Sequence, residues 1–167
     1  MPPSPGHLAA QYARDCATNR NSTGYLNLSA QMCWDAVVLC AHASGAIDRK
    51  TYQRLQNITA TNFSSFVRMI DPIVGDAAAM RRIPQGSFLG FIEHKNNIPT
   101  LIHAMIAVGH GLAAGNKNAC IGIGNPVGWE ILDLAGRLNW VPGTNCFNTA
   151  PPGQPGQRLV QIRYRTL

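Results

Sequence analysis

The chain has 167 residues, of which 46% are hydrophobic and 13% charged, and its formal net charge is +6. This composition is typical of one globular domain with its own core and excludes a disordered chain. No apolar run reaches the ~18 residues of a membrane-spanning helix, and the basic residues are too scattered for us to expect nucleic-acid binding.

The N-terminal half of the sequence predicts helices. Residues 1–6, which include three prolines, are expected to form a flexible arm, and residues 7–167 the folded domain. Helices are predicted over 7–17, from Ser29 as N-cap to about Ala43, from Asp48 as N-cap to 56, over 61–71 and over 75–82, with a loop at 18–24. The N-terminus has neither the basic region nor the apolar segment of a signal peptide.

The C-terminal half predicts mainly strands. They are expected over 87–93, 101–109 and 112–118, with turns at 94–97 and 110–111, and residues 119–124 continue the last strand or add another. A helix from Pro126 to about Leu138, an irregular loop over 142–157 and a closing strand over 158–165 follow. Helices first and antiparallel strands afterwards predict a single-domain α+β fold with helices packed on the sheet.

The hairpin over 101–118 places a histidine opposite an asparagine. With His110 and Gly111 as the turn residues, His103 faces Asn118. Residues that face each other have Cβ atoms ~4.5–5.5 Å apart, so the amide oxygen can accept a hydrogen bond from the imidazole. An unpaired imidazole is costly to bury in an apolar strand. We therefore predict that Asn118 orients His103 as a base.

Other residues could take these two roles. Asn116, on the same predicted strand, and Asn125, after the next apolar run, are alternative orienting groups. His110 is the alternative base, although a His-Gly pair at a hairpin tip also fits the left-handed conformation of a turn.

Cys33 is the candidate nucleophile. It precedes Trp34 in the first turn of a predicted helix, where the positive end of the helix dipole favours a thiolate. A thiol, a base and a group that orients the base together form a site for acyl transfer. A buried structural thiol is the alternative interpretation, and it is the role that we expect for Cys40.

The cysteine pattern bears on cofactors and compartment. Five cysteines leave at least one thiol free within a chain, and no Cys/His cluster has the spacing of zinc ligands. We therefore expect a reducing compartment and neither a metal nor a cofactor.

These motifs together resemble the papain-like cysteine protease superfamily. The resemblance rests on Cys-Trp at a helix start, on His-Ala in a central apolar strand that ends Val-Gly-x-Gly, and on the asparagine that follows, and it spans residues 27–118. The spacing from His103 to Asn118 is similar to that of small bacterial toxins and effectors, which include proteases and glutamine deamidases. The family has an oxyanion-binding glutamine six residues before its cysteine. This chain has Asn27 there and Gln31 two residues before Cys33.

The residues and the resemblance lead to one expected function. It is hydrolysis of an amide bond in a protein substrate, by proteolysis or glutamine deamidation, through Cys33, His103 and Asn118, with Asn27 or Gln31 as oxyanion donor. The resemblance implies an effector that is secreted without a cleavable signal peptide and acts in the reducing cytoplasm of a target cell, with an immunity protein or a chaperone as partner. A protein that is not secreted would be cytoplasmic. The alternative is a basic interaction module whose cysteine, histidine and asparagine are structural.

Overall fold

The computed structural model describes residues 1–56, 73–150, 153 and 156–167. Its first elements are the helices α1 (Pro5–Thr18), α2 (Thr23–Ala30), α3 (Cys33–Ala43) and α4 (Arg49–Gln56). The side chain of Ser4 caps α1 by accepting from the backbone N–H of His7. Pro5 and Gly6 therefore belong to this helix, which begins two residues before the predicted start at 7.

The predicted helix from Ser29 is in fact two helices. Ser22 caps α2, which begins within the predicted loop, and Gln31 is extended and ends it. Ser29 is not a cap, because its hydroxyl accepts from the backbone N–H of Trp129 at 2.9 Å. Helix α3 begins at Cys33, so the cysteine does lie in a first turn.

The remaining predicted helices have mixed outcomes. Asp48 caps α4, as predicted, by accepting from the backbone N–H of Thr51 at 2.7 Å. The predicted helix over 61–71 lies outside the described residues. The predicted helix over 75–82 is confirmed as the short helix α6 (Ala77–Arg81).

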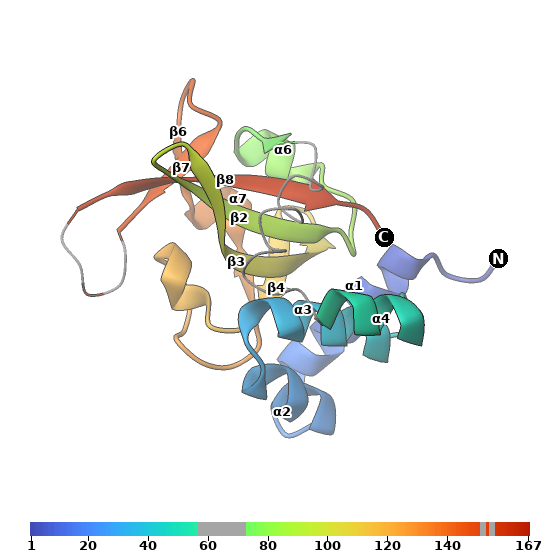
Figure 1. The fold of residues 1–167 in the computed structure, drawn as a ribbon. Coiled ribbons are helices and arrows are strands. Elements are labelled where there is room, and N and C mark those ends of the chain that lie inside the picture. The colour runs from blue at the N-terminus through green and yellow to red at the C-terminus, as the bar shows by residue number, and fades with distance from the viewer. Residues whose placement is uncertain (57–72, 151–152, 154–155) are drawn as a thin grey trace.

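The strands form one antiparallel sheet that curls around its own core (Figure 1). Its order is β5-β4-β3-β2-β8-β7-β6, and β1 pairs with β8. The strands are β1 (Ile73–Val74), β2 (Phe88–Lys95), β3 (Ile98–Gly109), β4 (Leu112–Gly115), β5 (Glu130–Asp133), β6 (Asn139–Val141), β7 (Cys146–Thr149) and β8 (Arg158–Arg165). The predicted single-domain α+β class is confirmed by this combination of helices and antiparallel sheet.

Three predictions between β4 and β8 are wrong. The segment over 119–124 holds a 3-10 helix, η1 (Asn118–Ile121), instead of a strand. The predicted helix from Pro126 to Leu138 is strand β5 followed by the single turn α7 (Leu134–Arg137), because β5 completes hydrogen bonds along the free side of β4. The predicted irregular loop over 142–157 contains β7, which pairs with β6 and β8.

The hairpin of β3 and β4 has a different register from the predicted one. His110 and Gly111 form the turn with φ of 56° and 82°, and Gly109 faces Leu112, as predicted. An irregularity between Ala107 and Gly109 then shifts the pairing, and β4 ends at Gly115. Asn118 therefore does not face His103 across a strand pair but lies at the start of η1.

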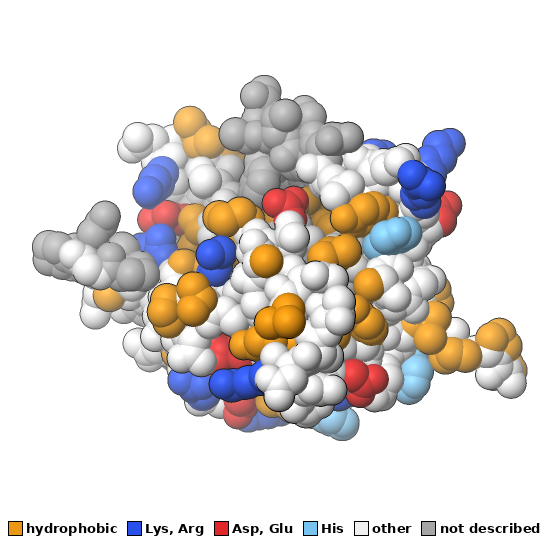
Figure 2. Space-filling view, turned by 90° about the horizontal axis from the view of Figure 1, so that it is seen from below, with side chains coloured by type: hydrophobic (Ala, Val, Ile, Leu, Met, Phe, Trp, Pro, Cys, Tyr) orange, Lys and Arg blue, Asp and Glu red, His pale blue; other side chains and the backbone are white. Residues whose placement is uncertain are grey.

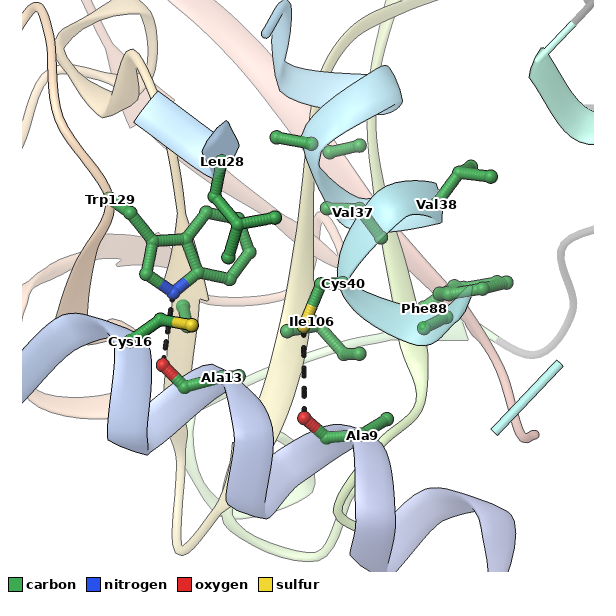
Figure 3. Packing of buried hydrophobic residues seen from close by; sticks show 14 of the residues in the cluster. Ala9, Ala13, Cys16, Leu28, Val37, Val38, Cys40, Phe88, Ile106 and Trp129 are labelled. Atoms are coloured by element: carbon green, nitrogen blue, oxygen red, sulfur yellow. Dashed lines mark hydrogen bonds between the residues drawn. The ribbon is translucent and has the colours of Figure 1, made fainter. Parts of the chain in front are cut away.

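Strand β3 separates two hydrophobic cores. Its Ala104, Ile106 and Val108 pack against the small side chains of α1 and α3. Met105 and Ala107 point to the opposite core, which includes side chains of α6 and α7. Figure 1 shows α1 to α4 gathered on one side of the sheet, and Figure 3 shows the core beneath them.

Two side chains tie the helical core together through hydrogen bonds to α1. The indole Nε1 of Trp129 donates to the Ala13 carbonyl at 3.0 Å. The thiol of Cys40 donates to the Ala9 carbonyl at 3.8 Å (Figure 3). Cys40 is fully buried, which confirms its predicted place in the core.

The helical side of the surface carries mixed charges. Figure 2 views the molecule from this side, and acidic and basic side chains lie near one another between small apolar groups. The positive net charge is therefore not gathered into one basic surface on this face. Within the described residues, no helix combines the length and the apolar character needed to cross a membrane.

We predict that Gly86→Ala destabilises the fold by about 2–3 kcal/mol more than Gly143→Ala. Both glycines have positive φ, 83° and 77°, so both substitutions carry the same left-handed strain. A Cβ at Gly86 would also overlap the backbone of Gly6 in α1, whereas nothing lies within 4 Å of a Cβ at Gly143. Urea unfolding of both variants measures the difference, and equal losses would contradict the close packing of Gly6 on Gly86.

Candidate active site

His103 is a buried histidine on β3 with a single hydrogen-bond partner among the described residues. Its side chain is 1% exposed, and its Nε2 lies 2.9 Å from Oδ1 of Asn118. The ring also contacts Phe91 of β2, with centroids 5.4 Å apart. Burial lowers the pKa of His103 to about 4, although the hydrogen bond to Asn118 acts in the opposite direction. The imidazole is therefore neutral at pH 7.

The hydrogen bonds of Asn118 determine which imidazole nitrogen carries the proton. The amide Nδ2 of Asn118 donates to the Gly115 carbonyl at 3.0 Å and to Oε1 of Glu130 at 3.1 Å. The amide oxygen must then face His103, and it can only accept, so Nε2 of His103 holds the hydrogen. Nδ1 is left with a lone pair, and this buried atom has no hydrogen-bond partner in the described structure.

Cys33 lies beside β3, at the residue that follows this histidine. It is half-buried at the start of α3, and the backbone N–H groups of Ala104 and Trp34 donate to its sulphur. Ala104 directly follows His103 in β3, so the thiol lies against the backbone of the residue next to the histidine. No hydrogen bond joins the sulphur to Nδ1 of His103, which remains without a partner.

The resting thiol is neutral. Burial raises the pKa of Cys33, and this effect outweighs the backbone N–H donors, which lower it. The N–H groups at the helix start thus lower the pKa of Cys33, as predicted. They do not offset the effect of burial, so the resting thiol keeps its proton. The half-buried thiol of Cys33 and the buried imidazole of His103 are thus both neutral at rest.

Asn116 does not orient His103, although it was an alternative for that role. It is fully buried, and its Nδ2 donates to the carbonyls of Leu28 and Ser29 in α2 and, at 2.6 Å, to that of Gln31. Its Oδ1 accepts from the backbone N–H of Gly128 at 2.9 Å. Asn116 therefore fastens the chain just before Cys33 to the loop before β5.

The other two alternatives also lie elsewhere. The amide Nδ2 of Asn125 donates to Oε2 of Glu130 at 2.8 Å. His110 is exposed in the turn between β3 and β4, with φ of 56°. Of the predicted histidines and asparagines, His103 and Asn118 are therefore the two that the structure joins by a hydrogen bond.

The two predicted oxyanion donors occupy different surroundings. Asn27 lies on α2 with its side chain exposed. Gln31 is half-buried in the link between α2 and α3, and its carbonyl accepts from Asn116. The role of either side chain as a donor remains a prediction.

Sequence reasoning missed two residues beside this site. Glu130 was assigned to a helix, whereas it lies on β5 and binds the amide of Asn118. Cys120 follows in η1, where burial and the nearby Cys33 thiol raise its pKa to about 11. The glycines and the proline over 122–128 indicate a loop before Glu130, but they do not distinguish a strand from a helix after it.

A cavity of about 480 Å³ lies beside η1. Its walls come from η1 and the following loop on one side and from β6, β7 and the end of α7 on the other. Ala119, next to Asn118, is among the lining residues, and Arg137 is the charged one. Cys33 and His103 do not line this cavity, so it adjoins the site and does not contain it.

Three comparisons with known proteins find no match: no family model, no curated protein and no solved structure is significantly similar to this chain. The geometry of the site therefore carries the functional argument. In the described part of the chain, no group of three or more His, Cys, Asp or Glu side chains could hold a metal ion.

We predict that His103 makes stability depend on pH. Its pKa is 6.5 in an unfolded chain and about 4 in the folded one, so between these values only the unfolded chain binds a proton there. The free energy of unfolding should fall by about 3 kcal/mol as the pH drops through this window. Urea unfolding at several pH values should show this fall in the wild type but not in His103→Gln. His110→Asn is the control and should retain it; an equal fall in His103→Gln would contradict the assignment.

We also predict that alkylation of Cys33 by iodoacetamide becomes faster with rising pH up to and beyond 9.0, the ordinary thiol value, because burial raises the pKa of this thiol. Peptide mapping by mass spectrometry assigns the label to Cys33. Cys40, which is fully buried, should be labelled only after unfolding. A rate that reaches its plateau below pH 7 would instead show a preformed thiolate–imidazolium pair.

Proposed function

We propose that this protein is a thiol hydrolase that attacks an amide bond of a protein substrate, with Cys33 as nucleophile, His103 as base and Asn118 as the group that orients the base. The observation that carries the proposal is the state of His103. Its Nε2 is held by Asn118, while its Nδ1 has a free lone pair in a buried position beside the segment that contacts Cys33. An imidazole with one nitrogen fixed and the other unpaired is the arrangement that a general base requires.

The proposed reaction follows from these positions. The thiol of Cys33 gives its proton to Nδ1 of His103 as the sulphur forms a bond to the amide carbon. The imidazolium returns that proton to the leaving nitrogen, and the carbon–nitrogen bond breaks to leave a thioester on Cys33. Water then attacks the thioester with His103 again as base, and the acid product and the thiol are released. Each neutral resting group thus acquires charge only during the reaction.

The negative charge of the carbonyl oxygen needs hydrogen-bond donors. The backbone N–H of Cys33 is one, because the first N–H groups of a helix have no partner within the helix. We propose a side-chain amide as the second, with Gln31 as the first choice. It lies in the link directly before α3, whereas Asn27 is exposed on α2.

Two exposed apolar side chains support a protein as the substrate. Met32 directly precedes Cys33 and is 62% exposed, and Val127 is 66% exposed. Asn116 binds the neighbours of both, Gln31 and Gly128, so the two segments that carry these side chains lie close together. Apolar side chains beside a nucleophile favour a polypeptide over a small polar substrate.

We also propose that the protein is related to the papain-like superfamily, which its sequence resembles. A cysteine at a helix start, packed against a strand that carries the histidine, is consistent with a papain-like arrangement of helices on an antiparallel sheet. By the same resemblance we propose a bacterial effector or toxin that acts on a protein in the reducing cytoplasm of a target cell. The five cysteines are free thiols in the structure, which is compatible with that compartment.

The test is intact-mass analysis of candidate substrate proteins after incubation with the wild type and with Cys33→Ala. Fragments would identify a protease. A mass change equal to the replacement of an amide NH₂ by OH would identify a glutamine deamidase. We expect activity to disappear in Cys33→Ala, to fall by at least ~10³-fold in His103→Ala and by about 10–100-fold in Asn118→Ala.

Cys146→Ala is the matched control, because Cys146 is a half-buried thiol on β7 outside the site. It should keep wild-type activity. Product formation that persists in Cys33→Ala would overturn the proposal. The proposal would also be overturned if no candidate protein and no peptide amide changed mass with any variant. The chain would then be better described as an interaction module.

A further inference from the structure

Glu130 ends a chain of hydrogen bonds that starts at His103. The imidazole donates to Asn118, and Nδ2 of Asn118 donates to Oε1 of Glu130 at 3.1 Å. The same Oε1 accepts from the backbone N–H of Asn125 at 2.5 Å, and Oε2 accepts from the Asn125 side chain at 2.8 Å. The carboxylate of Glu130 is thus held on both oxygens and cannot turn away from Asn118.

The backbone at Gly124 packs directly against the contact between Glu130 and Asn118. Gly124 has φ of 80°, and a Cβ there would lie 2.5 Å from Oε1 of Glu130 and 2.9 Å from Cβ of Asn118. A side chain at this position would push the carboxylate and the amide apart. Strand β5 supplies the other support, since Glu130 pairs with Gly115, whose carbonyl accepts the second hydrogen of Asn118.

A carboxylate differs from other partners because its oxygens only accept hydrogen bonds. If the amide of Asn118 turned over, its oxygen would meet two acceptors, the Gly115 carbonyl and the Glu130 carboxylate. Its NH₂ group would then face His103 and favour the tautomer with the proton on Nδ1. That tautomer could not take a proton from Cys33, so the orientation of one amide decides whether the imidazole is a base.

We propose that Glu130 is a positioning residue that fixes the amide of Asn118 and thereby keeps His103 in the tautomer with Nδ1 unprotonated. The consequence for catalysis rests on the proposed function, whereas the effect on the tautomer does not. Glu130 acts through Asn118 and does not itself touch the reacting atoms.

Three variants test this role. Glu130→Met keeps the length of the side chain but removes its strong acceptors. Glu130→Gln keeps one amide oxygen that can still accept from Asn118. Asp133→Asn is the control, because Asp133 is on the same strand and its carboxylate accepts from Gly136 at 2.8 Å, not from Asn118.

The readout is the pair of ¹⁵N chemical shifts of the His103 ring, which reports the tautomer without any substrate. We expect the wild type, Asp133→Asn and Glu130→Gln to show one tautomer with the proton on Nε2. Glu130→Met should show a mixture that includes the proton on Nδ1, together with a fall in kcat/KM of about 10-fold or more. A folded Glu130→Met protein with the single wild-type tautomer would overturn the inference.

A further variant covers the case in which Glu130→Met does not fold. Glu130→Asp keeps a carboxylate, but its side chain is one methylene shorter and should lose the contact with Nδ2 of Asn118, so we expect the same mixture of His103 tautomers. A folded Glu130→Asp protein with the single wild-type tautomer would overturn the inference. If the tautomer responds as expected but Cys33 hydrolyses no amide, the proposed function fails and the positioning role stands.

Discussion

The buried side chain of Asn116 is the interaction on which the rest of the structure depends, because it joins the helical half to the sheet. Its amide binds three carbonyls at and after the end of α2, the last being that of Gln31, and the backbone N–H of Gly128 before β5. Removing this one side chain would take a partner from the part-buried carbonyls of Ser29 and Gln31 and from the N–H of Gly128, which is costly. Since Cys33 follows Gln31 by two residues, Asn116 also places the thiol relative to the sheet.

The sequence was sufficient to predict the α+β class, the hairpin turn and the closing strand, because their signals are local. Glycine and histidine at the turn tolerate positive φ, and β8 alternates buried Val160 and Ile162 with more exposed neighbours. The apolar stretch after Pro126 was misassigned since a short apolar run fits both a helix and a strand. This segment forms a strand because it pairs with the free edge of β4. That pairing is a tertiary contact, which the local sequence does not reveal.

The structure contains the predicted hydrogen bond between His103 and Asn118, although the strand pairing from which we predicted it is absent. The register shift between Ala107 and Gly109 and the early end of β4 remove the strand pairing that was expected to place them together. Instead, η1 turns Asn118 toward the histidine. The raised pKa of Cys33 was also beyond sequence reasoning, because the helix start is visible in the sequence and the depth of burial is not.

Strand β3 has its alternate side chains in two different cores, with Ala104 and Ile106 under the helices and Met105 and Ala107 on the other side. Neither core can open fully without exposing this strand, so the two halves should unfold cooperatively, as one unit. The amide hydrogens of β3 should accordingly be among the slowest to exchange with solvent. His103 is thus carried by the strand whose exposure requires both cores to separate.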